Sequence, residues 1–156
     1  MKRITLFLIY GAVTIACLGL FAGWSWVYTT VQLKLATSRG LYATAEEGMQ
    51  ALIIPNYKDI DKIEIVYAGP NSFDGSDPHI WFVIARVYAR SRADGKLLGN
   101  QPRNYEAPGS FFLHTKQGWA HVSEGAFPEF IGFWMKVYGL AGPGSTRPTH
   151  EMLLVK

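Results

Sequence analysis

The sequence predicts an α+β protein, in which an N-terminal transmembrane helix precedes a small antiparallel sheet of three or four strands. An N-terminal and a C-terminal amphipathic helix are expected to pack against this sheet. Three observations support the prediction: a long uncharged N-terminus, two segments with helical apolar spacing, and alternating segments separated by turn residues. Roughly 120 residues follow the apolar N-terminus, which is enough for one compact domain.

The N-terminal segment has the length and composition of a membrane span. Residues 4–28 contain no charged side chain, and the first 20 or so would cross a hydrocarbon core roughly 30 Å thick as a helix. Trp24, Trp26 and Tyr28 follow, where aromatic rings favour the membrane–water interface. We therefore expect the lipid bilayer to contact residues 4–28.

The flanking charges predict the orientation of this span. Lys2 and Arg3 precede it, and short basic flanks remain cytoplasmic; Lys34 and Arg39 lie on the other side, beyond the aromatic residues. We expect a single-pass protein of the cytoplasmic (cell) membrane with its N-terminus inside. The sequence predicts three parts of the chain: an anchor with a short cytoplasmic N-terminus (1–33), an extracytoplasmic α+β domain (34–140) and a flexible C-terminal tail (141–156).

Two other interpretations of the N-terminus are less favoured. A cleaved signal peptide needs a shorter apolar region and a well-placed A-x-A-like site. The string Ile15-Ala16-Cys17 is similar to the end of a lipoprotein processing site, but Thr14 replaces the usual leucine and the apolar run continues afterwards. Cys17 is the only cysteine, which excludes an intramolecular disulfide and a cysteine-based zinc site.

The pattern after the span predicts two amphipathic helices. Residues 34–54 show helical spacing with a kink near residues 38–40, a capping box from Thr44 to Glu47, and a stop at Pro55. A second helix begins at Pro128, which suits a first helical position, and ends before Gly139. Both helices are expected to cover the apolar face of the sheet.

Strands are predicted between the two helices. Residues 79–92 give the strongest strand signal, with an apolar first half on both faces and a wet face in the second half. Residues 96–108 are expected to be loop because of Pro102 and Pro108. The other expected elements are a strand (62–68), a turn at Asp94-Gly95, and a hairpin (110–116 and 119–124) around Gln117-Gly118.

The expected order of elements resembles a cystatin-like fold in broad outline, a helix laid across a curved sheet. This resemblance concerns the fold only and implies no activity. The architecture is also similar to that of type IV pilins, whose N-terminal helix continues into a sheet domain. Their processing signature requires a glutamate five residues after the cleaved glycine, and Ala16 occupies that position after Gly11.

Candidate ligand-binding residues lie in the predicted hairpin. With Gln117-Gly118 as the loop, His114 lies opposite His121, with Cβ atoms about 5 Å apart. Two imidazoles at this distance can share a metal, with His79 as a third candidate ligand; two partly exposed polar side chains are the alternative. The loop from Asn71 to Asp77 offers oxygen ligands for calcium without the spacing of an EF-hand.

Two surfaces are candidates for partner binding. Arg86, Tyr88 and Arg90 share one face of the strongest strand and suit an anionic partner, unless they form cross-strand ion pairs. Phe133 and Trp134 make the last helix aromatic on more than one side, which favours a partner surface or contact with the bilayer beyond ordinary core packing.

The net charge and the missing motifs limit the classes of function that the sequence supports. The formal charge of +3 falls to about +1 without Lys2 and Arg3, which disfavours nucleic acid as a partner. The catalytic motifs of phosphate loops, zinc proteases and serine hydrolases are missing from the sequence, and we expect no cofactor. The leading hypothesis is a non-enzymatic binding or assembly module of the cell envelope that contacts another membrane or envelope protein. The alternative is a ligand- or metal-binding sensor or hydrolase with a pocket between sheet and helices.

Overall fold

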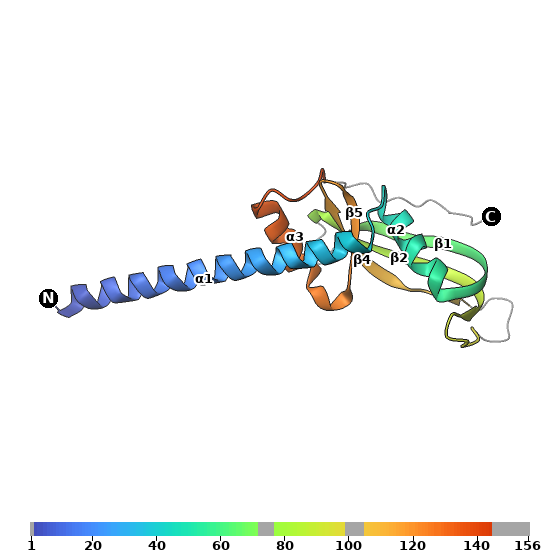
Figure 1. Cartoon of the computed structure of the whole chain (residues 1–156), viewed down its shortest axis with the longest axis horizontal. Coiled ribbons are helices and arrows are strands. Elements are labelled where there is room, and N and C mark those ends of the chain that lie inside the picture. The colour runs from blue at the N-terminus through green and yellow to red at the C-terminus, as the bar shows by residue number, and fades with distance from the viewer. Residues whose placement is uncertain (1, 72–76, 99–104, 145–156) are drawn as a thin grey trace.

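The computed structural model describes residues 2–71, 77–98 and 105–144, and it confirms the α+β class. A long apolar helix is followed by a five-stranded antiparallel sheet and two further helices that pack against the sheet. The N-terminal half of the long helix projects alone, and its C-terminal half runs along the domain (Figure 1).

The first helix, α1 (Lys2–Arg39), is a single element that passes from the apolar segment into the domain without interruption. The kink expected near residues 38–40 is in fact the end of this helix, at Gly40, whose φ of +147° favours glycine. Ser25 and Thr29 are fully buried although both are polar, because the domain packs over this part of α1. The segment of α1 from residue 25 to residue 39 therefore packs as part of the folded domain.

The second helix, α2 (Ala45–Ile53), begins as predicted. Thr44 accepts a hydrogen bond from the Glu47 amide through its hydroxyl, at 3.1 Å, and the Glu47 carboxylate accepts one from the Ala43 amide at 3.1 Å. The first bond satisfies an amide that the first turn of a helix leaves without a partner, and the second ties the residue before the cap to the helix. A short 3-10 turn, η1 (Ile54–Asn56), contains Pro55 and ends the helical segment.

Removal of the Thr44 hydroxyl is expected to weaken α2. The Thr44→Ala variant should lose about 1 kcal/mol of stability, since the Glu47 amide loses its acceptor within the protein. Thermal unfolding of the full chain in detergent, followed by circular dichroism, measures this loss. Thr44→Ser keeps the hydroxyl and serves as the control, so an equal loss in both variants would contradict the capping role.

The sheet has the order β1-β2-β4-β5, and a short β3 pairs with β2 beyond the end of β4. Its strands are β1 (Tyr57–Asn71), β2 (Asp77–Arg92), β3 (Tyr105–Glu106), β4 (Gly109–Thr115) and β5 (Gly118–Val122). The strands predicted around residues 62–68, 79–92 and the hairpin are confirmed, although β1 is longer than expected. The prediction of loop throughout residues 96–108 missed β3, whose two residues are too few to give a periodic pattern.

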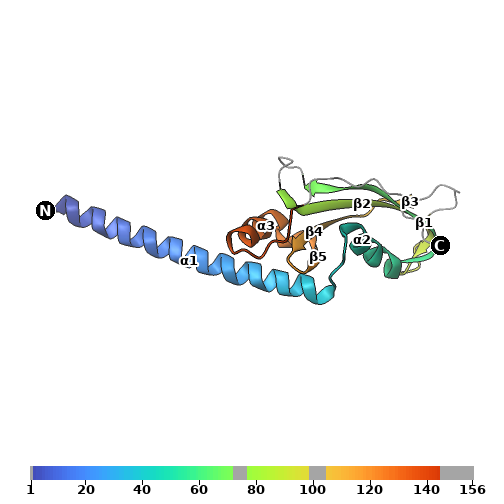
Figure 2. The ribbon, with the colours of Figure 1, turned by 90° about the horizontal axis from the view of Figure 1, so that it is seen from above.

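The third helix, α3 (Pro128–Val137), follows a 3-10 turn, η2 (Glu124–Ala126), and starts at the proline as predicted. The expectation that both helices cover one face of the sheet is wrong. Trp81 and Phe112 pack with α2, whereas their neighbours Ile80 and Leu113 pack with α3 and α1. Successive residues of a strand point to opposite faces, so the two helices cover opposite faces. Figure 2 shows α3 beside the middle of α1, and α2 further along the sheet.

Candidate functional site

Aromatic side chains gather where α3 lies against α1. We call this group the aromatic cluster; its members are Phe21, Trp24, Trp26 and Tyr28 of α1 together with Phe130, Phe133, Trp134 and Tyr138 of α3 and its C-terminal cap. Three ring pairs join the helices edge to face, with centroids 4.7–5.9 Å apart: Trp26 with Tyr138, Tyr28 with Phe130, and Phe21 with Trp134. Such pairs contribute roughly 0.5–1.5 kcal/mol each beyond the area they bury.

Hydrogen bonds fix the same two helices at both ends of the cluster. The Tyr138 hydroxyl donates to the Ala22 carbonyl at 3.1 Å and lies 2.9 Å from the Ser25 hydroxyl. The Tyr28 hydroxyl donates to the Ala126 carbonyl at 3.1 Å. Sequence reasoning missed Ser25, although a lone hydroxyl beside two tryptophans was the available signal. The contact therefore has a defined geometry and is not a loose apolar association.

The outer side of the cluster is exposed. Two of its members, Trp24 at 65% and Phe133 at 54%, are more than half exposed. The neighbouring residues Phe127 and Val137 are exposed at 70% and 55%. Of the two aromatic residues predicted to bind a partner, Phe133 is exposed and Trp134 is half-buried within the cluster. Large exposed apolar patches of this kind mark contact with a membrane or another protein.

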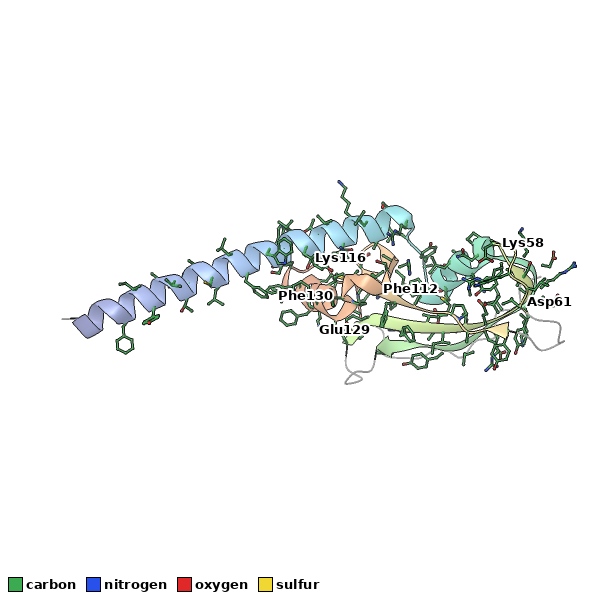
Figure 3. The ribbon with its side chains drawn as sticks, turned by 90° about the horizontal axis from the view of Figure 1, so that it is seen from below. Lys58, Asp61, Phe112, Lys116, Glu129 and Phe130 are labelled. Carbon is green, nitrogen blue, oxygen red and sulfur yellow. The ribbon has the colours of Figure 1, made fainter. Side chains whose placement is uncertain are left out.

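A cavity of about 470 Å³ opens between α1 and α3 at the edge of the cluster. Trp24 and Tyr28 line it from α1, and Phe127, Glu129 and Phe130 line it from the start of α3. Figure 3 shows Glu129 and Phe130 on the part of α3 that lies beside α1.

The cluster lies at the C-terminal end of the apolar part of α1. By its length and composition, this helix could cross a membrane as an anchor or a signal sequence. Residues 9–24 of this helix are all exposed, whereas Ser25, Thr29, Leu33 and Ala36 after them are buried. The cluster therefore marks the boundary between the free helix and the domain.

The predicted register of the β4–β5 hairpin is wrong. His114 pairs with Trp119, and His121 pairs with Phe112, because Lys116-Gln117 form the loop instead of Gln117-Gly118. The Thr115 hydroxyl holds this loop, because it donates to the Gly118 carbonyl at 2.8 Å and accepts from the Gln117 amide at 3.2 Å. In the same register, the Tyr42 backbone exchanges two hydrogen bonds of 2.9 Å with Trp119. The His114 ring stacks on Trp119 with centroids 4.3 Å apart and rings nearly parallel, at 2°.

Each of the two histidines lies in its own surroundings. Burial lowers the pKa of His121, and the positive charge of Arg39 lowers it further. Burial also lowers the pKa of His114, against a hydrogen bond with the Pro143 backbone, and His79 on the neighbouring strand adds to the decrease. Within the described ranges, no three histidine, cysteine or acidic side chains gather in a way that could hold a metal. Metal binding by His114 and His121 stays a prediction, and the proposed calcium loop lies largely outside the described residues.

The lowered pKa values predict how stability depends on pH. The folded state favours neutral imidazoles, so the contribution of His114 and His121 is complete above the unfolded pKa of about 6.5. It decreases as the pH falls from there through the lower folded pKa values, by at most about 1.4 kcal/mol per pH unit for each proton. Thermal unfolding of the full chain, measured at several pH values between about pH 8 and pH 5, should show this decrease in stability. The His114→Gln, His121→Gln double variant should flatten the profile; an unchanged slope would contradict the assignment.

The arginine surface forms a cross-strand network. Arg86 lies 3.4 Å from the Glu64 carboxylate and over the Tyr105 ring at 4.7 Å, and Tyr88 donates to Glu64 at 3.4 Å. The hydrogen bond with Tyr88 raises the pKa of Arg86. Arg90 is exposed. The cross-strand ion pair that was the alternative to partner binding is therefore present for Arg86. Partner binding by Arg86, Tyr88 and Arg90 stays a prediction.

Comparisons of the chain with protein-family models, with curated proteins and with solved structures found no match. The cystatin-like outline therefore stays a prediction, and the aromatic cluster is the feature of the structure that bears on function.

Proposed function

We propose that this protein is a single-pass membrane protein whose extracytoplasmic domain is a non-enzymatic binding or assembly module held against the bilayer surface. Lys2 and Arg3 favour an N-terminus inside the cell. The observation that carries the proposal is the aromatic cluster, which joins the domain to α1 at the end of the predicted span. Tryptophan and tyrosine prefer this level of the bilayer, where the ring is in an apolar setting and its polar atom is hydrated.

The continuity of α1 supports a rigid attachment. Residues 24–39 extend for about 24 Å at 1.5 Å per residue, and Ser25, Thr29, Leu33 and Ala36 along them are buried against the domain. A domain fixed along such a length cannot swing freely on its anchor. It presents the ends of β1 and β2 at Tyr57 and Arg92 at a constant height and angle above the membrane. This geometry suits assembly with another membrane or envelope protein.

Reporter fusions after Lys34 and at Lys156 test the orientation. Reporters that are active only outside the cytoplasm should be active at both positions. Activity only with cytoplasmic reporters would overturn the extracytoplasmic assignment.

A fluorophore at the aromatic cluster tests contact with the bilayer. Phe133→Cys in a Cys17→Ser background, labelled and reconstituted in vesicles, should be quenched by a lipid-attached quencher. The matched control is Asp61→Cys, at an exposed residue at the far end of the domain (Figure 3). Equal quenching at both positions, or none at position 133, would contradict the proposed contact. Recovery of a specific partner with the tagged protein from membranes then tests the assembly role.

The alternative function is a ligand-binding sensor or hydrolase, and one observation favours it. A cavity of about 360 Å³ lies between α1 and the β4–β5 loop, with Lys34 and Lys116 among its lining residues. The cavity beside His121 is far smaller, at about 10 Å³. Calorimetric titration with Zn²⁺ tests the metal-binding form of this alternative: His114→Ala, His121→Ala should lose the binding of the unsubstituted protein, and unchanged binding would exclude these residues.

A further inference from the structure

The cavity between α1 and the β4–β5 loop has a lysine on each of two walls. Lys34 belongs to the α1 wall, and Lys116 belongs to the loop wall beside α1 (Figure 3). We call it the lysine cavity. The described residues that line it come from α1, from the end of β4 with its loop, and from Leu140, and none of them is acidic. Its volume of about 360 Å³ falls in the range of small-molecule sites, which is roughly 300–1,000 Å³.

The walls of the lysine cavity are held in place without a ligand. The Thr115 hydroxyl closes the loop through its hydrogen bonds with the Gly118 carbonyl and the Gln117 amide. The Lys116 amide donates to the Leu140 carbonyl at 3.4 Å, and the Leu140 side chain packs on the core. The other wall is a continuous helix. A ligand therefore does not have to order the backbone that surrounds it, which favours binding.

The two ammonium groups of this cavity lack a carboxylate partner. Among the residues that the structure describes, neither Lys34 nor Lys116 has a carboxylate oxygen within 4.0 Å, whereas Lys62 and Lys136 each form an ion pair. Two like charges beside one cavity repel each other, and an anion between them reverses the sign of the interaction. Lysine carries its three donors on a flexible four-carbon stem, so both ammonium groups can turn toward one ligand.

The pair of cations matches a dianion. A phosphate monoester carries about 1.5 to 2 negative charges near pH 7 and three strong acceptor oxygens, and lysine is a common ligand of phosphate. Leu33 and Leu140 add apolar surface to the same cavity. We propose that the lysine cavity binds a phosphate monoester, with the phosphate between Lys34 and Lys116 and the carbon chain of the ester against the two leucines.

A phosphate monoester reaches the cavity from one of two sources, a lipid such as phosphatidic acid or a soluble ester. Lys34 follows Trp24 by ten residues, which is roughly 15 Å along a helix. Side chains of a helix point back toward its N-terminus, so the Lys34 ammonium lies closer to the headgroups than its backbone does. The lipid source depends on the proposed function, because only an anchored α1 brings the cavity near a bilayer. The soluble source does not depend on it.

Two binding measurements on the full-length protein in detergent test the proposal. In native mass spectrometry with equal amounts of dioleoyl phosphatidic acid and dioleoyl phosphatidylglycerol, the phosphatidic acid should be retained about three- to tenfold more. The reason is that its second charge meets a second lysine, and the range is that of two exposed ion pairs. In calorimetric titration, butyl phosphate should bind about three- to tenfold more tightly than butyrate, which carries a single charge.

The Lys34→Gln, Lys116→Gln double variant should lose both preferences. The matched control is Lys58→Gln, which removes an exposed ammonium group at the far end of the domain (Figure 3) and should leave both unchanged. Circular dichroism of each variant verifies that the fold is retained.

The outcomes separate the two sources from each other and from the proposed function. A preference for phosphatidic acid supports the lipid source, and binding of butyl phosphate without that preference supports the soluble one. Absence of both preferences, or their survival in the double variant, would overturn the proposed site. A missing quench at position 133 would contradict the proposed function, while the titration with butyl phosphate would still decide this inference.

Discussion

Replacement of Phe112 by alanine is expected to destabilise the domain by about 3–5 kcal/mol, the usual range for a buried phenylalanine. Phe112 is fully buried on β4 beneath α2, between Trp81 on β2 and His121 on β5. Its ring lies so close to Gly48 of α2 that a Cβ atom added at Gly48 would collide with the ring. Loss of the ring therefore leaves a cavity at the point where α2 approaches the sheet most closely, and the surrounding backbone cannot fill it.

Thermal unfolding of the full chain in detergent measures this effect. Phe133→Ala removes the same side chain from an exposed position, 54% accessible, and should change the stability of the detergent-solubilised protein far less. A small effect of Phe112→Ala, comparable with that of Phe133→Ala, would contradict the central role of this ring in the core.

Replacement of Trp134 by alanine is expected to release α3 from α1. Trp134 lies within 5.2–6.2 Å of four other rings, including Phe21 on α1 and Tyr138 at the end of α3. Because the side chain is half-buried, we expect a loss of about 2 kcal/mol, less than for a tryptophan in a core. A change of this size increases the population of the state in which α3 is detached from α1 by about 30-fold.

Hydrogen exchange of the α3 amides measures this release. Exchange should accelerate by about 10- to 30-fold in Trp134→Ala, whereas Trp134→Phe keeps an aromatic ring and should show a smaller change. Amides at residues 85–89 of β2 serve as an internal reference, since this part of the strand packs in the cluster with α2 and α3 packs near Ile80. Unchanged exchange in α3 would mean that Ile131 and Met135, which pack on the sheet, hold the helix without α1.

Part of the candidate site could be predicted from the sequence. The excess of aromatic residues in the last helix pointed to the bilayer or a partner, and Trp24, Trp26 and Tyr28 pointed to an interface. That these two groups meet could not be predicted, because residues more than a hundred positions apart are joined only by the tertiary fold. The cavity and the exposed Phe127 depend on the same contact.

The sequence by itself determined the elements with strong local signals: the long apolar helix, the capped start of α2, the strand predicted at residues 79–92, and the proline start of α3. Apolar periodicity, capping side chains and β-branched runs act within a few residues, so they can be read without a fold. The tertiary structure decided the rest. In the folded hairpin, Tyr42 pairs with Trp119, and His114 and His121 are not directly opposite each other. Because β2 carries apolar side chains on both faces, α2 and α3 pack on opposite faces of the sheet. The helix α1 continues to Arg39, where it packs against the domain. These outcomes depend on which distant surfaces meet, and local periodicity carries no information about that choice.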